Sequence, residues 1–146
     1  MQNKLSFLQL NHNKTKRNYL ERMQNKKVHC MKVAKNYERD YWDGNRKFGY
    51  GGYKYMPGRL TGVAKKIVKK FKLNNSSKIL DVGCGKGYLL FEIKKLLPNC
   101  IIAGIDISKH AIKNCHPEIK EHVFLYDAKK KLPFKNNKFD LAISFG

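Results

Sequence analysis

Residues 78–90 read KILDVGCGKGYLL. Ile79, Leu80 and Val82 suit the end of a buried strand, and three glycines follow at alternate positions before an apolar helix start. Glycine is favoured where φ is positive or where the backbone lies against a ligand. The stretch therefore predicts a strand, a glycine turn and a helix that hold a nucleotide-like ligand. Its G-x-G-x-G spacing differs from the dinucleotide fingerprint G-x-G-x-x-G, whose helix faces a pyrophosphate, so a ligand without phosphates fits better.

Three further apolar runs follow the turn, and two of them end at an aspartate. Residues 101–105 lead to Asp106, residues 123–126 lead to Asp127, and a last run covers residues 139–145. A carboxylate at the position of Asp106 can accept hydrogen bonds from both ribose hydroxyls. We expect four parallel strands whose ends converge on one crevice.

This ordered set of motifs resembles the class I S-adenosylmethionine-dependent methyltransferases, over residues 76–146. The resemblance implies that the glycine turn wraps the methionine part of S-adenosyl-L-methionine, that the acid after the second strand binds the ribose, and that the end of the third strand contacts the adenine. The cofactor-binding residues implied are Asp81, Gly83, Cys84, Gly85, Gly87, Asp106, Ile107, Asp127 and Ala128. No residue stands out as a catalytic base, and the methyl acceptor is not identified.

The resemblance also implies a fold class, an α/β Rossmann-like parallel sheet flanked by helices. That family has a seven-stranded sheet, whereas the sequence contains four strand candidates. We therefore expect a partial methyltransferase core, truncated after the fourth strand. An exposed sheet edge should then be covered by a partner or a second copy.

We expect two parts in the chain, an N-terminal extension over residues 1–60 and the cofactor-binding core over residues 61–146. Residues 1–16 read as a loosely ordered tail, and apolar spacing predicts one amphipathic helix from Arg17 to about Tyr41. Residues 44–58 interleave glycine with aromatic residues, which favours a mobile flap over the cofactor or acceptor, or alternatively a surface that stacks nucleic-acid bases. Trp42 is interpreted as a packing anchor.

Within the core we expect three helices. Thr61 is predicted to cap a helix to about Leu73 whose inner face carries Val63, Ile67 and Phe71. A buried helix should follow the glycine turn and end near Pro98, and Ser108 should cap a short third helix.

Composition limits the remaining possibilities. The formal net charge of +20 permits nucleic-acid contact through basic surfaces, although the lysines are spread along the chain. Four cysteines without paired spacing, no signal peptide and no apolar run near the roughly 20 residues that cross a bilayer predict a cytoplasmic protein without a metal site.

Three functions stay open on the sequence alone. The first is methyl transfer from S-adenosylmethionine, in which the protein supplies alignment and a dry pocket. The second is a nicotinamide-dependent oxidoreductase, which the glycine spacing disfavours. The third is a non-catalytic remnant that binds the cofactor or a nucleic acid.

Overall fold

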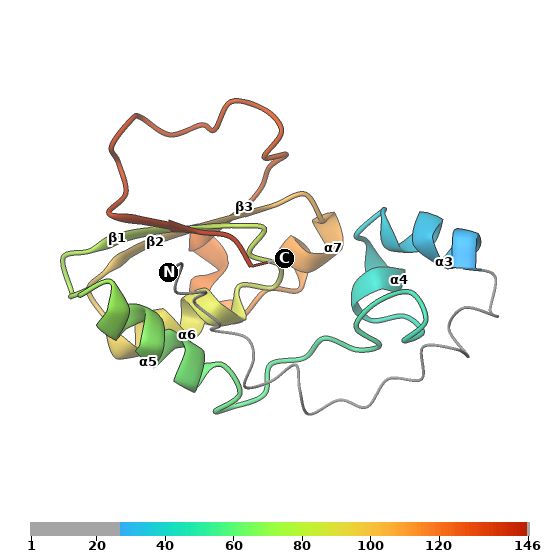
Figure 1. Ribbon diagram of the computed structural model, residues 1–146, viewed down its shortest axis with the longest axis horizontal. Coiled ribbons are helices and arrows are strands. Elements are labelled where there is room, and N and C mark those ends of the chain that lie inside the picture. Colours follow the sequence, from blue (N-terminus) through green and yellow to red (C-terminus); the bar gives the residue numbers. More distant parts are fainter. Residues whose placement is uncertain (1–26, 146) are drawn as a thin grey trace, which may run out of the picture.

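The computed structural model describes residues 27–145, and its centre is a parallel four-stranded sheet (Figure 1). The strand order is β3-β2-β1-β4, and all three pairings are parallel. The strands are β1 (Lys78–Val82), β2 (Ile101–Asp106), β3 (Val123–Leu125) and β4 (Leu141–Ile143). Each lies within an apolar run or overlaps one by most of its length, so the predicted Rossmann-like α/β sheet is confirmed.

The sheet has a topological switch point beside β1. The chain proceeds from β1 to β2 and β3 on one side, and then returns to pair β4 with the other side of β1. In register, Asp81 lies between Gly104 of β2 and Ile143 of β4. Open α/β sheets bind ligands outside the carboxyl ends of strands at such a point.

Two helices build the hydrophobic core on one face of the sheet. α5 (Thr61–Lys70) and α6 (Tyr88–Leu96) lie side by side beneath the strands in Figure 1. Their buried side chains and the strand residues of the same core are Val63, Ala64, Ile67, Leu90, Ile93, Ile79 and Ile102. Ile101 at the start of β2 is 52% exposed, and Phe124 and Leu125 on the edge strand β3 are 49% and 48% exposed.

The segment between β2 and β3 contains α7 (Lys109–Lys113) and a 3-10 helix, η1 (Pro117–His122). Ser108 caps α7 as predicted, because its Oγ accepts a hydrogen bond from the Ala111 N–H at 3.0 Å. The 3-10 helix was not predicted. Its Pro117 occupies the first turn, where a missing N–H has no cost.

The single N-terminal helix predicted to reach Tyr41 is wrong in its described part. The tail at 1–16 and the helix start at Arg17 lie outside the described residues. Beyond them, α3 (Lys27–Ala34) and α4 (Arg39–Trp42) are separate helices that contact each other, and α4 lies beside α7 (Figure 1). The helix breaks at Tyr37, whose φ of 51° is left-handed.

Two details of the prediction for α5 are also wrong. Thr61 begins the helix, but Leu60 holds the capping position, and the Thr61 hydroxyl instead donates to Glu92 Oε2 at 2.6 Å. Phe71 follows the helix end and is 42% exposed, while Ala64 is fully buried in the inner face.

Candidate ligand site at the glycine turn

The glycine turn joins the carboxyl end of β1 to α6 and binds the end of β2. The backbone N–H groups of Gly83 and Cys84 both donate to the carbonyl of Ile105, at 2.8 and 3.0 Å. Gly83, Gly85 and Gly87 have φ values of 80°, 57° and 72°, a region that other residues enter only with strain. The predicted need for positive φ is therefore met at all three positions.

The three glycines differ in what surrounds them. A Cβ on Gly85 would lie 2.7 Å from the ring of Trp42, and a Cβ on Gly87 would lie 2.4 Å from Ile119. A Cβ on Gly83 would have no neighbour within 4 Å. The glycines at 85 and 87 thus serve protein packing, and the turn borders open space at Gly83.

Asp106 connects the two loops at this edge of the sheet. Its Oδ2 accepts a hydrogen bond from the Gly85 N–H at 2.7 Å, and its Oδ1 accepts one from the Ser108 N–H at 2.8 Å. The side chain is 7% exposed. An ionised carboxylate has about four lone-pair positions, so two remain for a ligand.

Asp81 is the second buried acid of the site and is 4% exposed. Burial, followed by the charge of Asp106, raises the pKa of Asp81 to about 7. The hydrogen bonds of residues 27–145 include none to this carboxylate. A buried acid without a donor is costly to ionise, and a cationic or hydrogen-bonding ligand would relieve that cost.

The remaining predicted residues lie around this pair. Asp127 follows β3, the neighbour of β2, and closes a local turn through its Oδ1, which accepts from the Lys129 N–H at 3.0 Å. Ala128 is exposed, and Ile107 is 48% exposed. Burial raises the pKa of the Cys84 thiol, so Cys84 is a poor nucleophile. The structure brings the glycine turn, Asp81 and Asp106 together, with Asp127 on the next strand.

A segment that the sequence did not connect to this site lies against it. We call residues 37–55 the strap. Its Trp42 is 6% exposed, and the indole N–H donates to Ser108 Oγ at 2.9 Å while the ring covers Gly85. Glu38 accepts hydrogen bonds from the backbone N–H groups of Lys109 and His110, at 3.1 and 3.0 Å. Trp42 is therefore the packing anchor predicted for it.

A buried lysine of the glycine turn, Lys86, binds the strap at two residues. Lys86 is 4% exposed, and its Nζ donates to both oxygens of Asp43 at 2.8 Å and to the carbonyl of Tyr53 at 2.7 Å. His110 Nε2 lies 2.6 Å from Asp43 Oδ2. Burial opposes ionisation of Asp43, but hydrogen bonds from His110 and Lys86 outweigh it and lower its pKa to about 2.

The end of the strap is fixed by another buried acid. Glu92 of α6 is 1% exposed and accepts hydrogen bonds from the hydroxyls of Tyr55 and Thr61. These bonds outweigh the effect of burial and lower the pKa of Glu92. His116 stacks on Phe91 with ring centroids 3.5 Å apart. Neither Glu92 nor Lys86 was identified from the sequence, because their partners lie more than 30 residues away.

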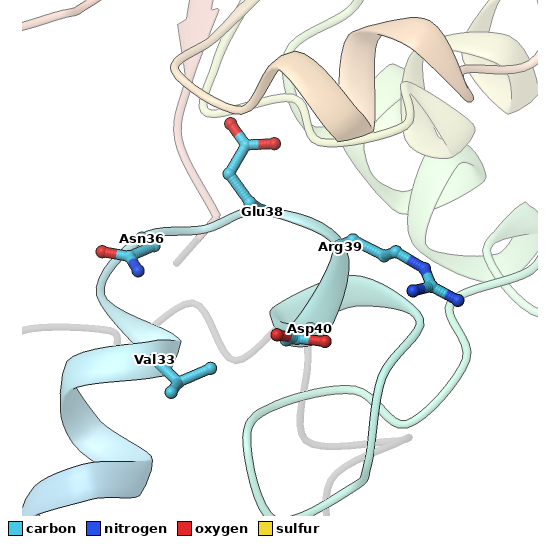
Figure 2. A pocket seen from close by; sticks show the side chains of 5 residues that line it. All are labelled: Val33, Asn36, Glu38, Arg39 and Asp40. Atoms are coloured by element: carbon cyan, nitrogen blue, oxygen red, sulfur yellow. The ribbon is translucent and has the colours of Figure 1, made fainter.

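A surface hollow of about 180 Å³ lies between α3 and α4, lined by Val33, Asn36, Glu38, Arg39 and Asp40 (Figure 2). Figure 2 shows Glu38 pointing away from the hollow toward a neighbouring helix, which the hydrogen bonds identify as α7. The Glu38 carboxylate is therefore engaged with α7 and does not serve the hollow, which carries no ligand proposal.

Residues 27–145 contain neither a metal-binding cluster nor a helix suited to cross a membrane. No group of three or more His, Cys, Asp or Glu side chains is arranged to hold a metal ion in this part of the chain. No helix in the same residues has both the length and the apolar character that a membrane crossing requires.

Comparison with known proteins identifies a family match and several relatives. A family model described as "Methyltransferase domain" matches residues 73–146. An uncharacterized protein of Methanocaldococcus jannaschii is 35% identical over 119 residues, covering 82% of this chain and 39% of the relative. A demethylmenaquinone methyltransferase of Thermotoga maritima is 26% identical over 121 residues, covering 82% of this chain and 50% of the relative.

A crystal structure from Methanococcus maripaludis, assigned to the S-adenosylmethionine-dependent methyltransferases, has the same fold. Its TM-score is 0.51 at 24% identity, over 57% of this chain and 40% of that chain. The present chain thus spans between 39% and 50% of the length of the two sequence relatives.

Proposed function

Because the chain belongs to the methyltransferase-domain family, we propose that it binds S-adenosyl-L-methionine beside β1 and transfers the cofactor's methyl group to an acceptor. The observation that carries the proposal is the buried acid pair, Asp81 and Asp106, beside the open flank of Gly83 at the switch point of the sheet. The bound cofactor supplies a methyl carbon already activated by a sulfonium.

The residues present fit such a ligand. Asp81 is a buried acid without a donor among the described residues, and the methionine part of the cofactor carries an ammonium group. Asp106 keeps lone pairs for the ribose hydroxyls while it holds the Gly85 and Ser108 N–H groups. Ile107, Asp127 and Ala128 follow the ends of β2 and β3, where we propose that they contact the adenine side of the ligand.

The protein's part in the reaction is alignment and exclusion of water. We propose no catalytic base, since the histidines nearest the turn have other contacts: His110 is bound to Asp43 and His116 stacks on Phe91. The division into an extension at 1–60 and a core at 61–146 is part of this proposal, with the strap belonging to the extension.

Location and partners remain predictions. Among residues 27–145 no disulfide joins Cys30, Cys84, Cys100 or Cys115, which supports the proposed cytoplasmic location. Two partners are proposed besides the methyl acceptor: a nucleic acid on the exposed lysines, and a second copy of the chain on the sheet edge. The alternative function is a non-catalytic remnant. Steep loss of RNA or DNA affinity with salt, together with sequence preference, would favour a nucleic-acid partner.

The cofactor is tested by calorimetry. Titration with S-adenosylhomocysteine should give saturable binding with a dissociation constant in roughly the micromolar range, and NAD under the same conditions should give none. Binding of NAD alone would favour the oxidoreductase and refute the proposal. Binding of S-adenosylhomocysteine without methyl transfer to any acceptor would favour the non-catalytic alternative.

A further inference from the structure

Lys86 is one of the two non-glycine residues between the three glycines of the turn, and its side chain bonds to the strap. We propose that Lys86 is a positioning residue of the cofactor site, and that its ammonium holds the strap so that Trp42 and Tyr53 close the side of the crevice next to the glycine turn. This inference rests on the proposed function, because the turn is the part expected to hold the methionine half of the cofactor.

Burial of the Lys86 ammonium is costly, and the oxygens that bind it determine where it lies. An ammonium that is 4% exposed loses most of its hydration, so it is destabilising unless protein oxygens replace the water. Three oxygens replace the water, two from Asp43 and one from the backbone of Tyr53. All three belong to the strap, so the ammonium fixes two points of the strap relative to the turn.

The second link concerns Asp43. Besides Lys86, its carboxylate contacts His110 on α7 and accepts the N–H of Tyr53 at 3.0 Å. Asp43 therefore joins the β1–α6 loop, α7 and the strap in one cluster. The β1–α6 loop and the loop that leads into α7 carry most of the proposed cofactor contacts, so a change in this cluster reaches both.

The third link is the aromatic surface that the strap presents. Tyr53 stacks on Tyr88 with ring centroids 5.1 Å apart, and Trp42 stacks on Tyr50 at 5.2 Å. Trp42 also covers Gly85 and bonds Ser108, one residue from each loop. The strap thus packs against both loops along one side of the crevice.

Two phenols of the strap have raised pKa values, chiefly because they are buried. Burial, then the neighbouring Tyr50 and to a lesser degree Asp81, raise the pKa of Tyr53 to about 12. Burial, neighbouring tyrosines and more weakly Asp106 raise the pKa of Tyr41 to about 12. Both phenols are therefore held in surroundings that disfavour their charged form, as packing of the strap against the protein requires.

The test uses the Lys86→Met variant, with Lys65→Met of the exposed face of α5 as the matched control. Trp42 is the chain's one tryptophan, so its emission reports on the strap directly. In Lys86→Met we expect the emission to shift to the red and acrylamide quenching to rise at least twofold. We expect affinity for S-adenosylhomocysteine to fall about tenfold, while affinity for adenosine, which lacks the methionine half, changes less than about twofold.

The results separate the role of Lys86 from the proposed function. Unchanged Trp42 emission in Lys86→Met, or equal losses for S-adenosylhomocysteine and adenosine, would refute a positioning role. If the wild type bound no S-adenosylhomocysteine, the proposed function would fail, and the Trp42 emission would still decide whether Lys86 holds the strap. If Lys86→Met does not fold, Asp43→Asn tests the same contact from its more exposed partner and should give the same changes in emission and affinity. Lys86→Gln keeps a hydrogen-bond donor at this position, so we expect smaller changes than in Lys86→Met.

Discussion

The Asp81→Asn variant is expected to be more stable than the wild type at pH 8 in the absence of cofactor, and to bind S-adenosylhomocysteine at least about tenfold more weakly. Burial and Asp106 raise the pKa of Asp81 to about 7 from its ordinary value of 3.8. Between these values the folded protein keeps a proton that the unfolded chain has lost. The free energy of unfolding of the wild type therefore falls as pH rises through this window.

The size and pH window of this effect follow from linkage. The full penalty is present above pH 7 and is on the order of 2–4 kcal/mol, whereas below pH 4 it is absent. Asn cannot ionise, so the variant escapes the penalty but also loses the charge offered to the cofactor. Urea denaturation of both proteins at pH 5 and pH 8 measures the difference.

The control for Asp81 is Asp40→Asn, a change to an exposed carboxylate of α4. It should leave the stability difference between pH 5 and pH 8 as in the wild type. A stability gap between Asp81→Asn and the wild type that stays constant over this range would contradict the assigned pKa. Undiminished affinity would remove Asp81 from the cofactor site.

Replacement of Asp106 by Ala is expected to lower affinity for S-adenosylhomocysteine about 100-fold or more, through loss of two charge-assisted hydrogen bonds to the ribose. It should also lower stability by roughly 2–5 kcal/mol, because the Gly85 and Ser108 N–H groups lose their shared acceptor. The structure thus gives Asp106 a role in holding the loops as well as the proposed role in binding.

The two roles are separated by the Asp106→Asn variant. Its amide keeps one acceptor oxygen and the volume of the side chain, so we expect most of the stability to return while affinity stays at least about tenfold low. Thermal melts by circular dichroism and calorimetry on the same samples give both quantities. A folded Asp106→Ala protein with wild-type affinity would remove Asp106 from the proposed site.

The features predicted correctly from the sequence depend on neighbours close in the chain. Positive φ at Gly83, the cap at Ser108 and the four strand runs are local properties. The resemblance to methyltransferases, which rested on the glycine turn and the strand ends, is confirmed by the family match to residues 73–146. The break at Tyr37 was missed, because a tyrosine with a left-handed backbone does not change the helical spacing of the apolar residues around it.

The strap could not be joined to the site in advance. Lys86 and Asp43 are 43 residues apart in sequence, and Trp42 and Ser108 are 66 apart. Lys86 reads as one more lysine in a chain with 31 Lys and Arg residues, and only the fold shows that it is buried. Likewise, Thr61 has the residue type of a cap, and the nearby carboxylate of Glu92 takes its hydroxyl instead.

The strap is bound to the protein at both ends, and this limits how a ligand can enter or leave the crevice. Glu38 is bound to the start of α7, and Tyr55 is bound to the buried Glu92. A segment anchored in this way cannot swing out about a single hinge. Entry and release would instead require the middle of the strap to bow outward, with Gly51 and Gly52, at φ values of 70° and 103°, as the points that bend most easily. Exchange would then be slow compared with a freely hinged lid, and its rate would depend on the Lys86 contact.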